Sequence, residues 1–290
     1  MFRKGLNMTN QKVVGDFPKS KSAILQMIDV KKSFGDKKVL DGITFEVEEG
    51  TFTCICGPSG CGKSTIINIL AGYLEADGGQ CKFQGQPITG PDVNRLVVFQ
   101  ETGLFFWMSL WDNVLFGPRN QGKDLRVAKQ KARELIEMSG LLGFEKKYPP
   151  QLSGGMQRRA ELIRALINDP KVLLLDEPFR GLDAMTRELM QAHFVKVFEE
   201  TKTTMVLITS ELDEAVYMGD RVYFLSTIPT TVKKQMPIPI SRPRDFKQLA
   251  SKEFSELVVE AYETMEAEAM KTFLTIKREV DKKKLFEDEI

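Results

Sequence analysis

The stretch Gly57-Pro58-Ser59-Gly60-Cys61-Gly62-Lys63-Ser64 fits the pattern G-x-x-x-x-G-K-[ST]. It follows an apolar, strand-like run at 53–56 and opens a helix-like run at 65–70, the setting in which this pattern binds phosphate. The glycines let backbone N–H groups converge on phosphate oxygens, and the start of a helix favours negative charge. We therefore predict a nucleotide-phosphate site made of Gly57, Pro58, Ser59, Gly60, Cys61, Gly62, Lys63, Ser64 and Thr65.

Lys63 and Ser64 have predicted roles within this loop. Lys63 would pair with the β- and γ-phosphates of ATP, and Ser64 would ligate Mg²⁺. A second run, 171–178, is an apolar strand that ends in Asp176 and Glu177. Asp176 at the strand tip can reach the metal, whereas Glu177 points to the other face and can polarise a water against the γ-phosphate. Alone, such a strand could simply end in a polar turn; beside a phosphate loop it indicates ATP hydrolysis.

The rest of the chain indicates an α/β protein. Almost continuously apolar runs are typical of parallel strands buried on both faces, and these lie at 53–56, 96–99, 172–175 and 205–208. Helix-like segments lie between or beside them, at 63–72, 125–139, 155–167 and 184–200. Three runs of alternating polarity predict antiparallel strands, at 23–34, 39–49 and 80–88. Strands that alternate with helices predict a βαβ core whose strand ends form a ligand-binding edge.

Composition excludes several classes of protein. The chain has 290 residues, 42% of them hydrophobic, and a formal net charge of +1, so it has neither a disordered composition nor an overall basic footprint for nucleic acid. No apolar run is long enough to span a bilayer, and no apolar block follows the polar N-terminus as in a signal peptide. We expect a cytosolic protein that at most docks on a membrane. The cysteines Cys54 and Cys56 are interpreted as small buried residues rather than metal or redox groups.

The segment Leu152-Ser153-Gly154-Gly155-Met156-Gln157-Arg158-Arg159 resembles the signature of ATP-binding-cassette (ABC) ATPases. The resemblance covers residues 24–240, with the motifs in the family's order. It implies a P-loop NTPase with a RecA-like parallel core, an antiparallel β subdomain and an inserted helical subdomain. It also implies a head-to-tail dimer in which Ser153, Gly154, Gly155 and Gln157 close over the nucleotide of the other subunit. A helix start is itself an anion site; alternatively, Ser153 only caps the helix.

The same resemblance assigns roles to four further positions. Phe34 would stack on adenine, although an aromatic in a strand could equally belong to the core. Gln100 would contact Mg²⁺ and the attacking water. Asp183 closes the loop Gly181-Leu182-Asp183, which in the family crosses the dimer interface, and Arg180 stands before it where a small residue is usual.

Ser210 occupies the position of a histidine that in the family contacts the γ-phosphate. A serine hydroxyl has a shorter reach and does not titrate near neutral pH. The single histidine, His193, lies in a helix-like run and is not expected to replace it. Two interpretations follow: a slow but competent ATPase, or a weakly hydrolysing regulatory cassette paired with a second ABC ATPase.

Two segments, 99–114 and 214–222, resemble the importers of nitrate, sulfonates and taurine. We therefore predict an ATP-hydrolysing subunit that powers import of a small solute through a separate permease, at the cytoplasmic face of the inner membrane. Its expected partners are a second ABC ATPase, transmembrane permease subunits and an external solute-binding protein. A soluble cassette working on DNA or ribosomes would need tandem cassettes, a coiled coil or basic surfaces, none of which the sequence contains. The sequence does not identify the solute.

The expected domain division has three parts. Residues 1–22 form a tail, 23–240 the ATPase domain with its helical subdomain at about 101–165, and 241–290 a helical extension. In the helical subdomain, the aromatic run at 105–107 and Trp111 would contact the permease or pack internally. In the extension, Leu257, Val258, Tyr262 and Met265 recur at helical spacing and predict an amphipathic helix that packs on its own domain, with partner docking or regulation as the alternative.

Overall fold

The computed structural model describes residues 23–287, so the predicted tail at 1–22 and the last residues, 288–290, lie outside it. The larger of its two sheets has six strands in the order β10-β9-β3-β8-β7-β6. Strands β3, β6, β7, β8 and β9 run parallel, and β10 pairs with β9 in the antiparallel sense. Their bounds are Phe52–Cys56 (β3), Arg95–Val98 (β6), Val172–Asp176 (β7), Thr204–Thr209 (β8), Arg221–Leu225 (β9) and Val232–Pro237 (β10). The four predicted parallel strands are confirmed.

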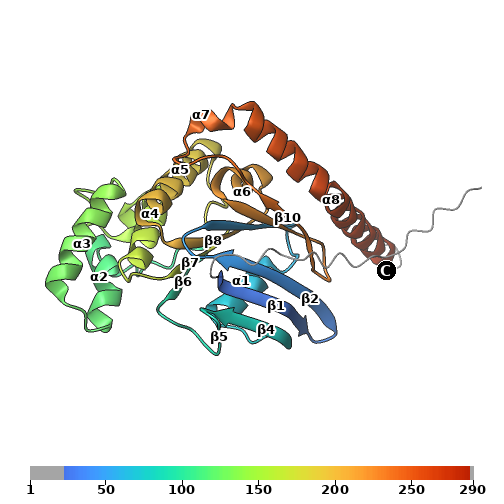
Figure 1. The fold of residues 1–290 in the computed structure, drawn as a ribbon, viewed down its shortest axis with the longest axis horizontal. Helices are drawn as coiled ribbons and strands as arrows, with labels where there is room; N and C mark the ends of the chain where they lie inside the picture. Colours follow the sequence, from blue (N-terminus) through green and yellow to red (C-terminus); the bar gives the residue numbers. More distant parts are fainter. Residues whose placement is uncertain (1–22, 288–290) are drawn as a thin grey trace, which may run out of the picture.

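The smaller sheet is antiparallel and packs below the first in Figure 1. Its order is β2-β1-β4-β5, with bounds Ala23–Phe34 (β1), Lys37–Glu48 (β2), Gly78–Phe83 (β4) and Gln86–Pro87 (β5). The prediction of one strand over 80–88 was wrong. Gln84 and Gly85 both have positive φ angles, 48° and 77°, and form a turn that separates β4 from β5.

Helices connect the parallel strands and form a lobe at one side of the molecule, where Figure 1 shows α2, α3 and α4. The helix bounds are Lys63–Ala71 (α1), Leu110–Asn120 (α2), Leu125–Met138 (α3), Gly154–Leu166 (α4), Ala184–Thr201 (α5), Leu212–Met218 (α6), Phe246–Leu249 (α7) and Lys252–Glu287 (α8). The four predicted helices are confirmed to within a residue at each end. The sequence did not predict α2, whose interior carries Gly117 and Pro118, two poor helix formers.

Strand β3 is buried on both faces and joins two apolar cores. Phe52, Cys54 and Cys56 lie in the core shared with α4, α5 and α6, whereas Ile55 faces the core shared with α1 and the antiparallel sheet. Burial raises the pKa of the Cys56 thiol to about 12, so it stays neutral and packs as a small apolar group. The loop that follows β3 therefore starts from a fixed position.

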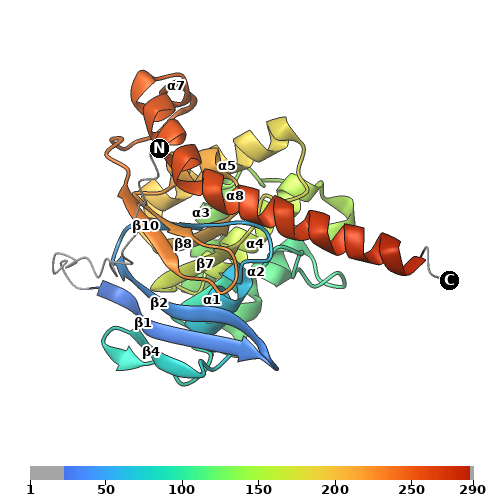
Figure 2. The same cartoon turned by 90° about the vertical axis from the view of Figure 1, so that its right-hand side faces the viewer.

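The C-terminal helix α8 packs against α6 and extends from α7 across the molecule (Figure 2). Phe254, Ala261 and Met265 are buried in the core beneath it. The predicted amphipathic helix is confirmed, except that Tyr262 lies on its exposed side. Among residues 23–287, no helix combines the length and the apolar composition that a bilayer crossing requires.

Glu268 anchors α8 to the turn between β9 and β10. Its carboxylate is fully buried and accepts hydrogen bonds from the backbone N–H (2.8 Å) and the hydroxyl (3.0 Å) of Thr227. Lys271 and Lys233 lie 2.7 and 3.3 Å from it. Burial alone would raise the pKa of Glu268, but these donors and cations outweigh it and lower the pKa to about 2.

We predict that Glu268→Ala loosens α8, because the half-buried Thr227 N–H loses its acceptor. The local free energy of opening should fall by about 1–3 kcal/mol, measured as faster amide hydrogen exchange over residues 252–271. Glu263→Ala, on the exposed side of the same helix, is the matched control. Equal exchange rates in the two variants would contradict the anchoring role.

A second buried carboxyl, Glu214, ties α6 to its neighbours. It accepts hydrogen bonds from Gln191 of α5 (2.8 Å) and from Thr209 of β8. Burial raises its pKa from 4.5 to about 7, an effect that these hydrogen bonds only partly offset and that the nearby charge of Glu211 reinforces.

This shift predicts a pH-dependent stability. The unfolded chain ionises Glu214 above pH 4.5, while the folded protein resists ionisation up to about pH 7. The contribution of Glu214 is therefore fully present below the lower value and lost as the pH rises through the upper one. The free energy of unfolding in urea should fall less for Glu214→Gln than for the native protein between pH 5 and pH 8. The difference between the two should change by on the order of 1–2 kcal/mol in favour of the variant. Glu188→Gln, at an exposed position of α5, should show no such gain; a gain for Glu214→Gln that is equal at both pH values would refute the assignment.

Candidate active site

The phosphate loop lies between β3 and α1, at the carboxyl edge of the parallel strands. Lys63 is buried, and its ammonium donates hydrogen bonds to the carbonyl oxygens of Gly57 (2.9 Å) and Pro58 (3.1 Å). Gly62 begins α1 at φ 99°, and a Cβ there would lie 2.7 Å from Val39. Only glycine combines this conformation with this close approach. The loop therefore wraps around the ammonium group of its own lysine.

The end of β7 brings two carboxylates to this loop. Asp176 lies beside Ser64, whose hydroxyl donates to Oδ1 over 3.3 Å, and Glu177 Oε1 lies 3.1 Å from the ammonium of Lys63. Burial raises the pKa of Asp176. A hydroxyl and a carboxylate in contact are oxygen ligands of the kind that Mg²⁺ prefers, so this pair fits the predicted metal.

Glu177 has an unusual backbone conformation. Its φ is +43°, in the left-handed region that residues other than glycine rarely adopt. The backbone N–H of Glu177 donates to the carbonyl of Ile208 on β8 over 3.1 Å, which holds the strained residue in place. Strain of this kind collects at functional sites, where a side chain must take one orientation.

A cavity of about 360 Å³ opens above the phosphate loop. It brings together predicted residues from distant segments: Phe34 at the end of β1, Gln100 after β6, and Glu177 after β7. Phe34 is 50% exposed, so it lies at the cavity surface and not in the core. The remaining lining residues are Lys37, Val39, Ser59, Gly60, Gly62, Lys63, Ser64, Thr65, Arg180 and Ile228.

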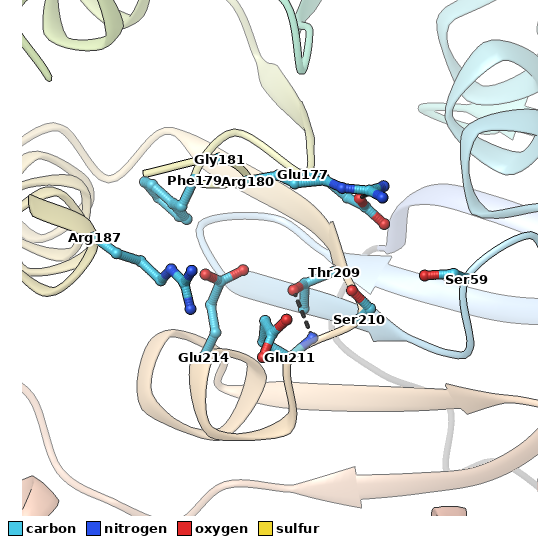
Figure 3. A pocket seen from close by; sticks show the side chains of 10 residues that line it. All are labelled: Ser59, Glu177, Phe179, Arg180, Gly181, Arg187, Thr209, Ser210, Glu211 and Glu214. Carbon is cyan, nitrogen blue, oxygen red and sulfur yellow. Dashed lines mark hydrogen bonds and ion pairs between the residues drawn. The ribbon is translucent and has the colours of Figure 1, made fainter. Parts of the chain in front are cut away.

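A smaller polar cavity of about 210 Å³ adjoins the first, and Figure 3 shows its lining. Ser210, at the end of β8, lines it together with Glu177, so the structure brings these two predicted residues to one cavity. His193 does not line it but lies in α5, where burial and then the nearby charges of Arg159 and Lys196 lower its pKa to about 4. The imidazole is therefore neutral and apart from the phosphate loop.

The signature segment begins α4. Ser153 caps this helix by accepting from the backbone N–H of Met156 over 3.3 Å, and Gly154 and Gly155 form its first turn. Gln157 donates from its side chain to two backbone carbonyls, those of Pro149 (3.0 Å) and Leu152 (3.1 Å). The capping role considered for Ser153 is thus present in the structure.

Asp183 lies with the signature and not with the phosphate loop. It caps α5 by accepting from the N–H of Thr186 over 3.0 Å. A cavity of about 620 Å³ contains Ser153, Gly154, Gly155 and Asp183, and it shares no lining residue with the cavity above Lys63. Within one chain, the predicted nucleotide residues therefore form two separate groups.

Sequence reasoning missed two features of the site. Arg180 forms an ion pair with Glu177, with 2.9 Å between Nη1 and Oε2. Ile228, from the turn after β9, lines the cavity above the phosphate loop. The unusual arginine at 180 was a usable signal, because it stands three residues after Glu177, whereas nothing local marks Ile228.

Comparison with known proteins agrees with this geometry. Residues 40–180 match the family model described as ABC transporter. An uncharacterized ABC transporter ATP-binding protein of Methanocaldococcus jannaschii is 40% identical over 77% of this chain and 83% of its own length. An aliphatic sulfonates import ATP-binding protein of Bacillus thuringiensis is 40% identical over 76% of this chain and 89% of its own length. A taurine import ATP-binding protein of Roseobacter denitrificans is 42% identical over 70% of this chain and 76% of its own length.

Solved structures give the same result. The protein cbiO1 of Clostridium perfringens, part of the ABC transporter complex cbiONQ, superposes with a TM-score of 0.70 at 26% identity, and the match covers 82% of this chain and 95% of cbiO1. An ATP-binding cassette solved as a dimer with ADP and phosphate has a TM-score of 0.64 at 27% identity, and the match covers 75% of this chain and 100% of that cassette. The predicted fold class, a P-loop NTPase with an antiparallel β subdomain and a helical subdomain, is confirmed. With relatives of 40% identity that it matches over most of their length, this chain belongs to the ATP-binding proteins of ABC transporters and is an ATPase.

Proposed function

We propose that this ATPase powers the import of a small anion of the sulfonate or taurine type through a separate permease. Relatives named for import of aliphatic sulfonates and of taurine support the solute class, since they are 38–42% identical over most of their length. The observation that carries the chemistry is the contact of Lys63 and Ser64 with the two carboxylates at the end of β7.

The residues of the cavity have separate roles in ATP hydrolysis. Lys63 and the amides of the phosphate loop bind the phosphates of ATP. Ser64, Asp176 and Gln100 would hold Mg²⁺, which offsets phosphate charge when bound. Glu177 orients a water whose oxygen bonds to the γ-phosphorus while the bond from that phosphorus to the β–γ bridging oxygen breaks and ADP leaves. The proton of the water passes to Glu177.

A second cassette completes the site in this proposal. The signature residues Ser153, Gly154 and Gly155 line a cavity that shares no residue with the cavity above Lys63, so we assign them to the nucleotide of another subunit. A head-to-tail pair would bring the signature of each subunit onto the nucleotide of the other. The relative solved as a dimer supports such pairing. The partner is a second copy of this chain or a different cassette.

The helical lobe would contact the permease. Phe106 and Trp107 are 56% and 71% exposed, whereas Phe105 packs on Phe116 with ring centroids 4.7 Å apart. Trp111 lines an adjoining groove of about 1030 Å³. Exposed aromatics beside a groove suit a helix-in-groove interface. We place the subunit peripherally at the cytoplasmic face of the membrane, with an external solute-binding protein as a further partner.

This proposal keeps the expected domain division. Residues 23–240 would form the ATPase domain with a helical subdomain at about 101–165, and 241–290 a helical extension. By their bounds, α2, α3 and most of α4 would belong to the helical subdomain, and α7 and α8 to the extension.

The proposed mechanism predicts that Glu177→Gln binds Mg-ATP but does not hydrolyse it. Loss of the proton acceptor should reduce the ATPase rate by about a hundredfold or more, and the trapped nucleotide should favour the dimer in size-exclusion chromatography. Cells that carry only this variant should lose uptake of labelled taurine or alkanesulfonate. Full ATPase activity in Glu177→Gln would refute the role of Glu177, and unchanged uptake would refute the coupling.

Ser210 separates the competent ATPase from the weakly hydrolysing alternative. If the short hydroxyl limits the rate, Ser210→His should raise the steady-state ATPase rate by roughly three- to tenfold, because an imidazole adds a longer hydrogen-bonding group beside Glu177. The native protein and Ser210→Ala are the references. An unchanged or lower rate in Ser210→His would remove the idea that this position weakens hydrolysis.

A further inference from the structure

Arg180 lies where the phosphate loop, the end of β7 and the end of β8 meet. Its backbone N–H donates to the carbonyl of Glu177 over 3.1 Å, which closes a turn directly after the strand. Its guanidinium then returns to the Glu177 carboxylate, with 2.9 Å between Nη1 and Oε2. The Arg180 side chain is 57% exposed and that of Glu177 only 11%, so the arginine covers the carboxylate from the solvent side.

The Glu177 carboxylate thus bridges two cations. One oxygen lies 3.1 Å from the ammonium of Lys63, and the other contacts Arg180. Lys63 is buried and held by two loop carbonyls. Arg180 has no other ion pair among the described residues, and its exposed side chain is free to change partner.

Arg180 is also at the boundary of two cavities. It lines both the cavity above the phosphate loop and the smaller polar cavity that contains Ser210, and only Ser59 and Glu177 share this position with it. Figure 3 shows Arg180 and Glu177 together at one side of the smaller cavity. The other arginine there, Arg187, is directed to the carbonyl of Leu182 over 3.2 Å. Of the two arginines, Arg180 is therefore the one that faces the phosphate loop.

We infer that Arg180 binds the terminal phosphate of ATP. Its guanidinium leaves the Glu177 carboxylate and pairs with the phosphate when ATP is bound. This inference rests on the proposed nucleotide site at the phosphate loop. A γ-phosphate beside Lys63 brings oxygens that compete with the Glu177 carboxylate for both cations. A guanidinium pairs readily with phosphate because its planar N–H groups match two oxygens.

The exchange has two consequences. ADP lacks the third phosphate, so Arg180 stays on Glu177 and contributes little to binding ADP. With ATP, the two cations turn to the phosphate, and the carboxylate is released to orient water. Arg180 therefore discriminates ATP from ADP and links the release of Glu177 to the presence of a γ-phosphate.

The test compares affinities for two nucleotides, measured by calorimetry with Mg²⁺ on the full chain. The β,γ-imido analogue of ATP reports the triphosphate without hydrolysis, and ADP reports the shared part. Arg180→Ala should weaken binding of the analogue by about tenfold, the usual effect of losing one charged hydrogen-bond partner. Its affinity for ADP should change by less than about twofold, because ADP lacks the phosphate that Arg180 binds.

Two further variants make the result specific. Arg180→Lys should recover part of the lost affinity for the analogue, because it keeps the charge but not the planar donor pair. Arg187→Ala, which removes the other arginine of the smaller cavity, should leave the ratio of the two affinities unchanged. Equal losses for both nucleotides in Arg180→Ala, or no loss for either, would overturn the inference. Native protein that binds neither nucleotide would instead refute the proposed nucleotide site.

Discussion

The parallel arrangement of β3, β8 and β7 is the constraint on which the site depends. Parallel strands end at one edge of a sheet, and here the phosphate loop, Ser210 and the pair Asp176-Glu177 each follow such an end. Both faces of these strands carry buried apolar side chains, so a change of strand register would expose core residues to solvent. Residues more than a hundred positions apart in the sequence, such as Ser64 and Asp176, thereby come within hydrogen-bonding distance.

The site concentrates charge in a confined space. Lys63, Glu177 and Arg180 form a continuous row of alternating sign, while Asp176 stands beside Ser64 with its pKa raised by burial. Such a row tolerates a multiply charged anion because Lys63 and Arg180 can each exchange the Glu177 carboxylate for a ligand oxygen. The positive φ of Glu177 keeps its carboxylate within this row. The second group of predicted nucleotide residues lies around Ser153, at the start of helix α4.

The sequence predicted the parts of this structure that are local. The phosphate loop is a contiguous pattern, and the buried parallel strands are contiguous apolar runs, so both could be located within a residue or two. Strand β9 was not predicted although its residues 222–225 are as apolar as the predicted runs, and β10 was missed because it carries Lys233 and Lys234. Helix α2 was missed because Pro118 obscures its periodicity. The ion pair of Arg180 and the contribution of Ile228 to the cavity depend on how separate loops meet, which no local pattern encodes.

The turn at 226–231 links the C-terminal helix α8 to the phosphate loop and to the cavity above it. Thr227 bonds to Glu268 of α8, Ile228 lines the cavity, and the hydroxyl of Thr230 donates to the carbonyl of Cys61 in the phosphate loop. The backbone of Thr230 is fixed as well, since it exchanges hydrogen bonds with Val39 and Asp41 of β2. Helix α8 and the phosphate loop thus both form hydrogen bonds with the same six-residue turn. A displacement of α8 would therefore be transmitted through this turn to the backbone of the phosphate loop.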